Sequence, residues 1–160
     1  MGDSHRFDLF ARMVATNFPK KDARIVDVAG GKGYLKEALR DLGYTNVLTM
    51  DKNRKAAKKQ KHLAYKYGYF NCNTQEHFDC VVAMHPDEAT DHAVLYATKH
   101  RVPAFVCPCC IKPDAAAFFE RYNFPNWVNH LKRLARGMDV QELYLKMAGK
   151  NLVLKLTPRR

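Results

Sequence analysis

The chain has 160 residues, of which 47% are hydrophobic and 27% are charged. This length fits one domain with a continuous core, and the composition lacks the depletion of apolar residues that marks disorder. No stretch approaches the roughly 20 apolar residues of a membrane-spanning helix, and the N-terminus lacks the pattern of a secretory signal. We therefore expect residues 1–160 to form a single soluble domain in the cytoplasm, with the nucleus as the alternative compartment.

The charge is strongly unbalanced. The formal net charge is +11, from 27 lysines and arginines against 16 acidic residues. Such a surface attracts polyanions, and nucleic acids are the commonest polyanionic partners of proteins. The alternative is a basic protein whose charge only keeps it in solution.

Hydrophobic periodicity predicts alternating helices and strands along the first two thirds of the chain. A first helix ends at Pro19, and a strand over 25–28 leads through a glycine turn into a helix over 34–42. The next elements expected are a strand over 46–50, a basic helix over 52–66, a short strand at 67–70, a buried strand over 78–84, a helix over 88–99 and a strand over 103–107.

The last third of the sequence changes its rhythm. Helical patterns at 114–122 and 126–136 are separated by Pro125. Residues 140–147 and 151–156 then alternate apolar and polar side chains around Gly149, as an antiparallel hairpin would. Repeated strand–helix units closed by a hairpin predict an α/β fold with a doubly wound, mostly parallel sheet that ends in an antiparallel hairpin.

The glycine turn after the first strand is the leading candidate for a ligand site. Ligands of doubly wound sheets bind at the carboxyl ends of the strands, and Gly30, Gly31 and Gly33 permit a close approach to the backbone. The following helix offers free N–H groups to a carboxylate or phosphate. Asp51 follows about 20 residues later, where an acid accepts hydrogen bonds from both ribose hydroxyls. The alternative is a tight turn without a ligand.

Residues 26–33, Val-Asp-Val-Ala-Gly-Gly-Lys-Gly, resemble the first motif of class I S-adenosylmethionine-dependent methyltransferases. The resemblance implies a Rossmann-like methyltransferase domain with S-adenosylmethionine as cofactor. It implies a cofactor site made by Asp27, Ala29, Gly30, Gly31, Gly33, Asp51 and Lys52. A nicotinamide dehydrogenase fits less well, because Lys36 stands where the third glycine of its G-x-G-x-x-G pattern belongs.

A second resemblance lies in residues 84–91, Met-His-Pro-Asp-Glu-Ala-Thr-Asp, together with the later Pro-Cys-Cys at 108–110. These segments are similar to those of a methyltransferase subgroup that includes tRNA 2′-O-methyltransferases. Asp87 and Glu88 replace the usual Cys-Gly, and the zinc-finger segments of the tRNA enzymes are absent. The expected function is methyl transfer to RNA. The alternatives are a protein or small-molecule acceptor, or a non-catalytic cofactor-binding protein that assists a partner.

Three candidate catalytic residues follow the buried strand: His85, Asp87 and Glu88. They should lie at the same edge of the sheet as the glycine turn. His85 suits a general base because its ordinary pKa is near neutrality, and either acid can orient the acceptor or receive its proton. Catalysis by alignment needs no base. In the structural alternative, His85 supports the loop and Asp87 or Glu88 caps the next helix.

The basic stretch supplies candidate contacts to RNA phosphates at Lys52, Arg54, Lys55, Lys58, Lys59 and Lys61. Stacking surfaces for exposed bases are expected at Tyr65, Tyr67, Tyr69 and Phe70. The alternative is a solvated helix face with the aromatic rings packed inward. A protein partner that helps to recognise the substrate is also considered.

The clustered cysteines raise the question of a metal. Cys107, Cys109 and Cys110, with His85 as a fourth ligand, have the donor types of a zinc site. Adjacent Cys109 and Cys110 would strain tetrahedral geometry, and structural zinc sites usually pair cysteines as C-x-x-C. We therefore expect reduced, buried thiols at a strand end and no metal.

Overall fold

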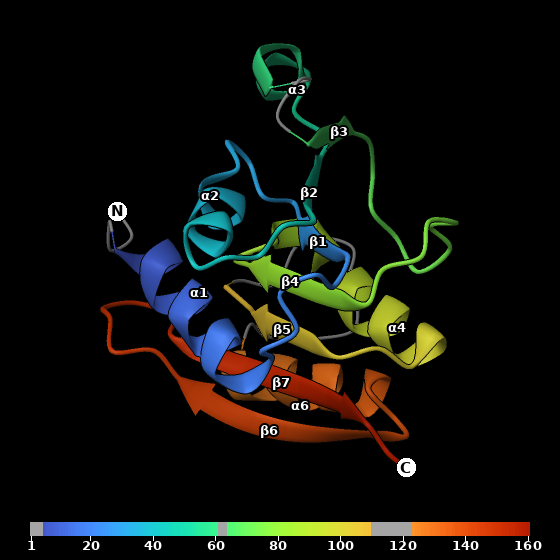
Figure 1. The fold of residues 1–160 in the computed structure, drawn as a ribbon. Helices are drawn as coiled ribbons and strands as arrows, with labels where there is room; N and C mark the ends of the chain where they lie inside the picture. The colour runs from blue at the N-terminus through green and yellow to red at the C-terminus, as the bar shows by residue number, and fades with distance from the viewer. Residues whose placement is uncertain (1–4, 61–63, 110–122) are drawn as a thin grey trace.

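A computed structural model describes residues 5–60, 64–109 and 123–160. Seven strands form one sheet in the order β3-β2-β1-β4-β5-β7-β6 (Figure 1). The parallel strands are β1 (Ile25–Val28), β2 (Val47–Asp51), β3 (Tyr65–Tyr67), β4 (Cys80–Met84) and β5 (Ala104–Cys107). The hairpin of β6 (Met138–Tyr144) and β7 (Leu152–Pro158) joins antiparallel to β5. The predicted fold class is confirmed.

Helices cover both faces of the sheet. On one face α1 (Arg6–Asn17) packs against α2 (Tyr34–Asp41), and on the other α4 (Thr90–His100) packs against α6 (Phe124–Leu134). The short helix α3 (Arg54–Gln60) stands away from the sheet beyond β2 and β3. Among the described residues, no helix has the length and apolar character needed to cross a bilayer.

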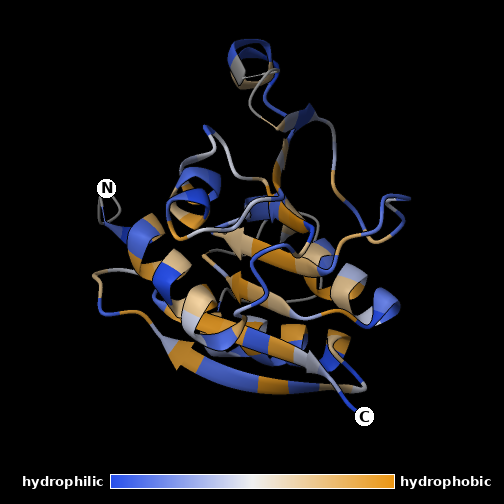
Figure 2. Ribbon diagram, in the orientation of Figure 1, coloured by the Kyte–Doolittle hydropathy of each residue, from blue (hydrophilic) through white to orange (hydrophobic). Residues whose placement is uncertain are grey.

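Two cores lie on the two faces of the parallel strands. Neighbouring residues of one strand point to opposite faces, so Val81 joins the core under α4 and α6 while Val82 joins the core under α1 and α2. Every residue of β1, β4 and β5 is buried. Burial on both faces explains why these strands are nearly continuous apolar runs (Figure 2). The cores thereby fix the carboxyl ends of β1, β2 and β4 side by side.

Some predicted elements are shifted. The third strand occupies Tyr65–Tyr67 instead of 67–70, because Tyr65 pairs with Thr49 and Tyr67 with Asp51. The basic helix is accordingly shorter than predicted. The helix predicted from residue 88 begins with a 3-10 turn, Asp87–Ala89, so α4 starts at Thr90. The helix predicted at 114–122 lies outside the described residues.

Candidate functional site

The glycine turn connects the carboxyl end of β1 to the N-terminus of α2. Ala29, Gly31 and Gly33 have left-handed backbones with φ of 53°, 57° and 80°, and the Gly33 amide closes the turn on the Gly30 carbonyl at 2.9 Å. A Cβ on Gly30 would lie 2.0 Å from a carboxylate oxygen of Asp27, so glycine is required there. A Cβ on Gly31 would meet no described atom within 4 Å. The Gly31 side of the turn is therefore open.

The side chain of Asp27 packs against Gly30 of this turn. Its side chain is 1% exposed, and the Thr49 hydroxyl donates to its Oδ2 at 2.9 Å. Burial raises the pKa of Asp27 to about 7, outweighing the opposite effect of the Thr49 hydrogen bond. This buried position indicates that Asp27 holds the shape of the turn.

Asp51 joins the turn to the neighbouring strand. Its Oδ2 accepts a hydrogen bond from the Gly31 amide at 2.8 Å, and its Oδ1 accepts one from the Asn53 amide at 2.8 Å. A carboxylate offers about four acceptor positions, so both oxygens keep capacity for further donors. Asp51 is half-buried. These residues fit an adenosine-containing ligand, because two ribose hydroxyls can share an acid that already orders the open turn.

Sequence reasoning missed two residues that support the turn. The Tyr65 hydroxyl donates to the Gly31 carbonyl at 2.7 Å, and Thr49 holds Asp27. Asp27, Thr49 and Tyr65 form a row because they are paired across β1, β2 and β3. The only signal in the sequence is the spacing of two between Thr49 and Asp51, which puts both on one face of a strand. No local pattern indicates Tyr65.

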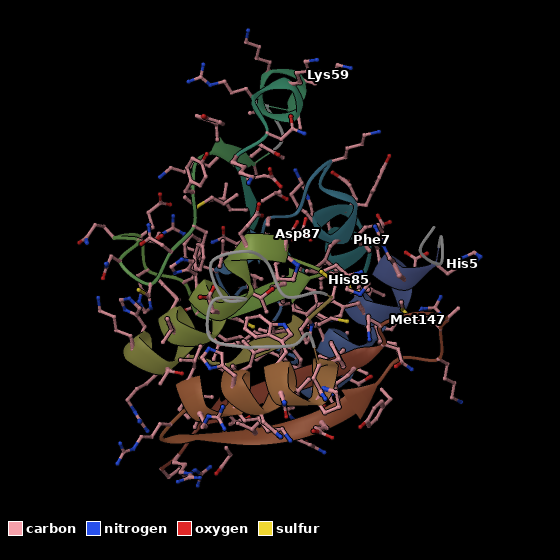
Figure 3. All side chains as sticks on the ribbon, turned by 180° about the vertical axis from the view of Figure 1, so that it is seen from behind. His5, Phe7, Lys59, His85, Asp87 and Met147 are labelled. Atoms are coloured by element: carbon pink, nitrogen blue, oxygen red, sulfur yellow. The ribbon has the colours of Figure 1, made fainter. Side chains whose placement is uncertain are left out.

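His85 follows β4, on the other side of β1 from Asp51. Its backbone is left-handed with φ of 51°, and its Nε2 lies 2.9 Å from the Lys150 carbonyl oxygen in the β6–β7 turn. Burial lowers the pKa of His85, which favours the neutral ring at neutral pH. Figure 3 shows His85 and Asp87 at this end of the sheet.

Asp87 and Glu88 lie at the same sheet edge. Asp87 is exposed and accepts a hydrogen bond from the Cys109 thiol at 3.4 Å. Glu88 forms a half-exposed ion pair with Lys52 at 3.0 Å. Because Lys52 follows β2 and Glu88 lies beyond β4, this pair reaches across the end of β1. The helix-capping alternative is wrong, since Ala89 precedes α4 without any side-chain cap.

The described cysteines of this segment, Cys107 and Cys109, lie at the carboxyl end of β5. Cys107 is buried, its thiol donates to the Lys150 carbonyl at 3.5 Å, and burial raises the pKa of that thiol to about 12. Cys109 is half-buried, and Cys110 lies outside the described residues. Over 5–60, 64–109 and 123–160, no three His, Cys, Asp or Glu side chains are grouped to hold a metal ion.

A basic and aromatic surface extends from the end of β2, and Figure 2 shows α3 as largely hydrophilic. We call it the α3 surface; its exposed members are Lys52, Arg54, Lys55, Lys58, Lys59, Tyr67 and Tyr69. Arg54 Nε donates to the Tyr67 hydroxyl at 3.1 Å, and Tyr69 is 70% exposed. Lys61 lies outside the described residues. The stacking role expected for Tyr65 and Phe70 is wrong, because both rings are buried.

Comparisons with known proteins agree with this geometry. A family model described as "Methyltransferase domain" matches residues 4–113. No curated protein matches the sequence. Streptomyces venezuelae DesVI is 13% identical with a TM-score of 0.64, over 97% of this chain and 92% of its own. A ribosomal protein L11 methylase from Lactobacillus delbrueckii subsp. bulgaricus is 14% identical with a TM-score of 0.65, and the match covers 100% of this chain and 82% of that protein. Magnesium protoporphyrin IX methyltransferase from Synechocystis is 11% identical with a TM-score of 0.66, and the match covers 97% of this chain and 80% of that protein. Its structure was solved with bound S-adenosylmethionine. At such identities these structures establish the fold.

Proposed function

The chain belongs to the family that this methyltransferase-domain model describes, and S-adenosylmethionine is its cofactor; from this premise we propose that the methyl acceptor is RNA. The observation that carries the proposal is the α3 surface, where exposed cations and exposed tyrosines adjoin the strand that ends at Asp51. The resemblance of residues 84–91 to a subgroup that includes tRNA 2′-O-methyltransferases supports the same acceptor.

The glycine turn and Asp51 are assigned to the cofactor, which supplies a methyl group on a positively charged sulfur. Asp51 accepts hydrogen bonds from the ribose hydroxyls with the acceptor positions that Gly31 and Asn53 leave open. Gly30 and Gly31 let the backbone approach the ligand closely. Asp27 and Tyr65 hold the turn in the required shape.

The segment after β4 is assigned to the acceptor. β4 is adjacent to β1, so His85, Asp87 and Glu88 lie one strand away from the glycine turn. A neutral His85 is able to receive a proton from the acceptor. Asp87 and Glu88 orient the acceptor through their exposed carboxylates. Asp51 and the turn should therefore govern cofactor binding, while His85 and Asp87 govern turnover.

The α3 surface has the two components that single-stranded RNA recognition uses. Cations such as Lys55, Lys58 and Lys59 contact phosphates, and exposed rings such as Tyr67 and Tyr69 stack on bases. α3 begins shortly after Asp51. An RNA bound on this surface would thus pass close to the cofactor.

The test is the salt dependence of binding to a single-stranded RNA oligonucleotide, measured by fluorescence anisotropy. Each lost phosphate contact lowers the slope of log K against log salt by about 0.7, so Lys55→Glu with Lys58→Glu and Lys59→Glu should lower it by about 2. The matched control reverses the charges of Arg133, Arg136 and Arg160, which are exposed in or after α6 and after β7, beside the edge of the sheet opposite to β3. Equal weakening by both triple variants would show that RNA binds through general charge and not at the α3 surface.

A further inference from the structure

The turn between β6 and β7 contacts the side chain of His85. The Lys150 carbonyl oxygen lies 2.9 Å from His85 Nε2. A carbonyl oxygen has no hydrogen to donate, so Nε2 must carry the hydrogen of this bond. In a neutral imidazole the other nitrogen, Nδ1, then keeps its lone pair.

We propose that Lys150 is a positioning residue whose backbone carbonyl fixes His85 as the Nε2–H tautomer and so makes Nδ1 the base in methyl transfer. This role rests on the proposed function. The O–H or N–H bond of the acceptor breaks and its proton goes to Nδ1. The freed electron pair bonds to the methyl carbon, and the pair of the broken carbon–sulfur bond stays on sulfur. Sulfur loses its positive charge, and His85 gains it as an imidazolium.

Among the described residues, groups from α1, from the segment after β4 and from the β6–β7 turn affect the pKa of this ring. Arg6 of α1 disfavours the charged ring, whereas Asp87 and the Lys150 carbonyl favour it. Cys107 of β5 shares the Lys150 carbonyl and is a neutral thiol, because burial raises its pKa to about 12. Burial of His85 is the largest effect, and the net result is a lowered pKa. The ring is thus neutral before the step, and Asp87 and the carbonyl stabilise the imidazolium that forms.

The position of the carbonyl depends on the shape of the turn. The Leu145 amide donates to the Asn151 carbonyl and the Asn151 side chain donates to the Leu145 carbonyl, both at 2.9 Å. Gly149 supplies a left-handed backbone with φ of 83° directly before Lys150. Gly149→Ala therefore strains the turn at the point where the carbonyl is presented.

Gly137 offers a matched control. It precedes β6 at the other end of the hairpin, with φ of 90°, and no described atom lies within 4 Å of a Cβ added to either glycine. Gly137→Ala and Gly149→Ala thus introduce the same kind of backbone strain. Only Gly149→Ala introduces it beside His85.

The experiment reads the His85 ring nitrogens by ¹⁵N NMR, with His85→Gln used to assign the signal. In the wild type we expect about a tenfold excess of the Nε2–H form over the Nδ1–H form at neutral pH, as one net hydrogen bond provides. Gly149→Ala should reduce this excess several-fold, and Gly137→Ala should leave it unchanged. A predominant Nδ1–H form in the wild type, or equal changes in both variants, would overturn the proposal.

A second readout connects the tautomer to the reaction. At saturating acceptor and cofactor, Gly149→Ala should lower the rate of methyl transfer several-fold without changing cofactor affinity, because the displaced carbonyl no longer stabilises the imidazolium that forms, whereas Gly137→Ala should keep the wild-type rate. An unchanged rate in Gly149→Ala, with the tautomer shifted, would refute the role of Nδ1 as base. The NMR result needs no acceptor, so it stands apart from any failure of the proposed function.

Discussion

Asp27→Asn removes a buried carboxyl group whose pKa is raised by burial from 3.8 to about 7. Since the pKa is higher in the folded than in the unfolded chain, the group stabilises the fold at low pH, and this stability is lost as the pH rises from about 4 to 7. A shift of about 3 pKa units corresponds to roughly 4 kcal/mol. Asparagine keeps an oxygen that can accept the Thr49 hydroxyl but has no proton to lose.

The assay is chemical unfolding of the wild type and of Asp27→Asn at pH 5 and pH 8. The free energy of unfolding of the wild type, minus that of the variant, should fall by roughly 2.5 kcal/mol between these two pH values. Asp41→Asn, which changes an exposed carboxylate at the end of α2, is the control and should show no such change. A wild-type minus Asp27→Asn difference that stays constant from pH 5 to pH 8 would refute the raised pKa of Asp27.

Three further results are expected. Gly30→Ala should prevent the native turn from forming, because its Cβ would lie 2.0 Å from a buried carboxylate oxygen of Asp27. Gly31→Ala should lower the stability in thermal unfolding by only about 1–2 kcal/mol. Similar losses of stability in both variants would contradict the packing of Asp27 against Gly30. Asp51→Ala should weaken S-adenosylmethionine binding about tenfold to a hundredfold in calorimetry, since bonds to a charged group contribute about 1.5–3 kcal/mol; unchanged affinity would remove Asp51 from the site. Cys107, with its pKa raised to about 12, should react with iodoacetamide roughly a hundredfold more slowly than Cys109 by mass spectrometry; equal rates would place both thiols in similar surroundings.

The parts of the fold that depend on residues close together in the sequence could be predicted from it. A short apolar strand, three glycines and an amphipathic helix determine the β1–turn–α2 unit locally, and Asp51 follows at the end of the next strand. The terminal hairpin follows from alternation around Gly149. Local patterns were sufficient because each residue's role there depends on its own strand or turn.

The parts that depend on distant pairing were missed. Tyr65, Tyr67 and Tyr69 alternate in the sequence, but only Tyr65 is buried, where it pairs with Thr49 inside the sheet, whereas Tyr67 pairs with Asp51 at the end of β2. The contact between His85 and Lys150 joins residues 65 positions apart. Such contacts arise when the sheet is assembled, so no window of sequence contains them.

The most direct test of methyl transfer to RNA is incubation of the protein with methyl-labelled S-adenosylmethionine and a cell extract, followed by separation of the RNA, protein and metabolite fractions. Label should enter the RNA fraction. Asp51→Ala should reduce the label in RNA in proportion to its loss of cofactor affinity. The triple variant of Lys55, Lys58 and Lys59 should reduce it in proportion to its loss of RNA affinity. Label found only in protein or metabolites, or in no fraction, would contradict RNA as the acceptor.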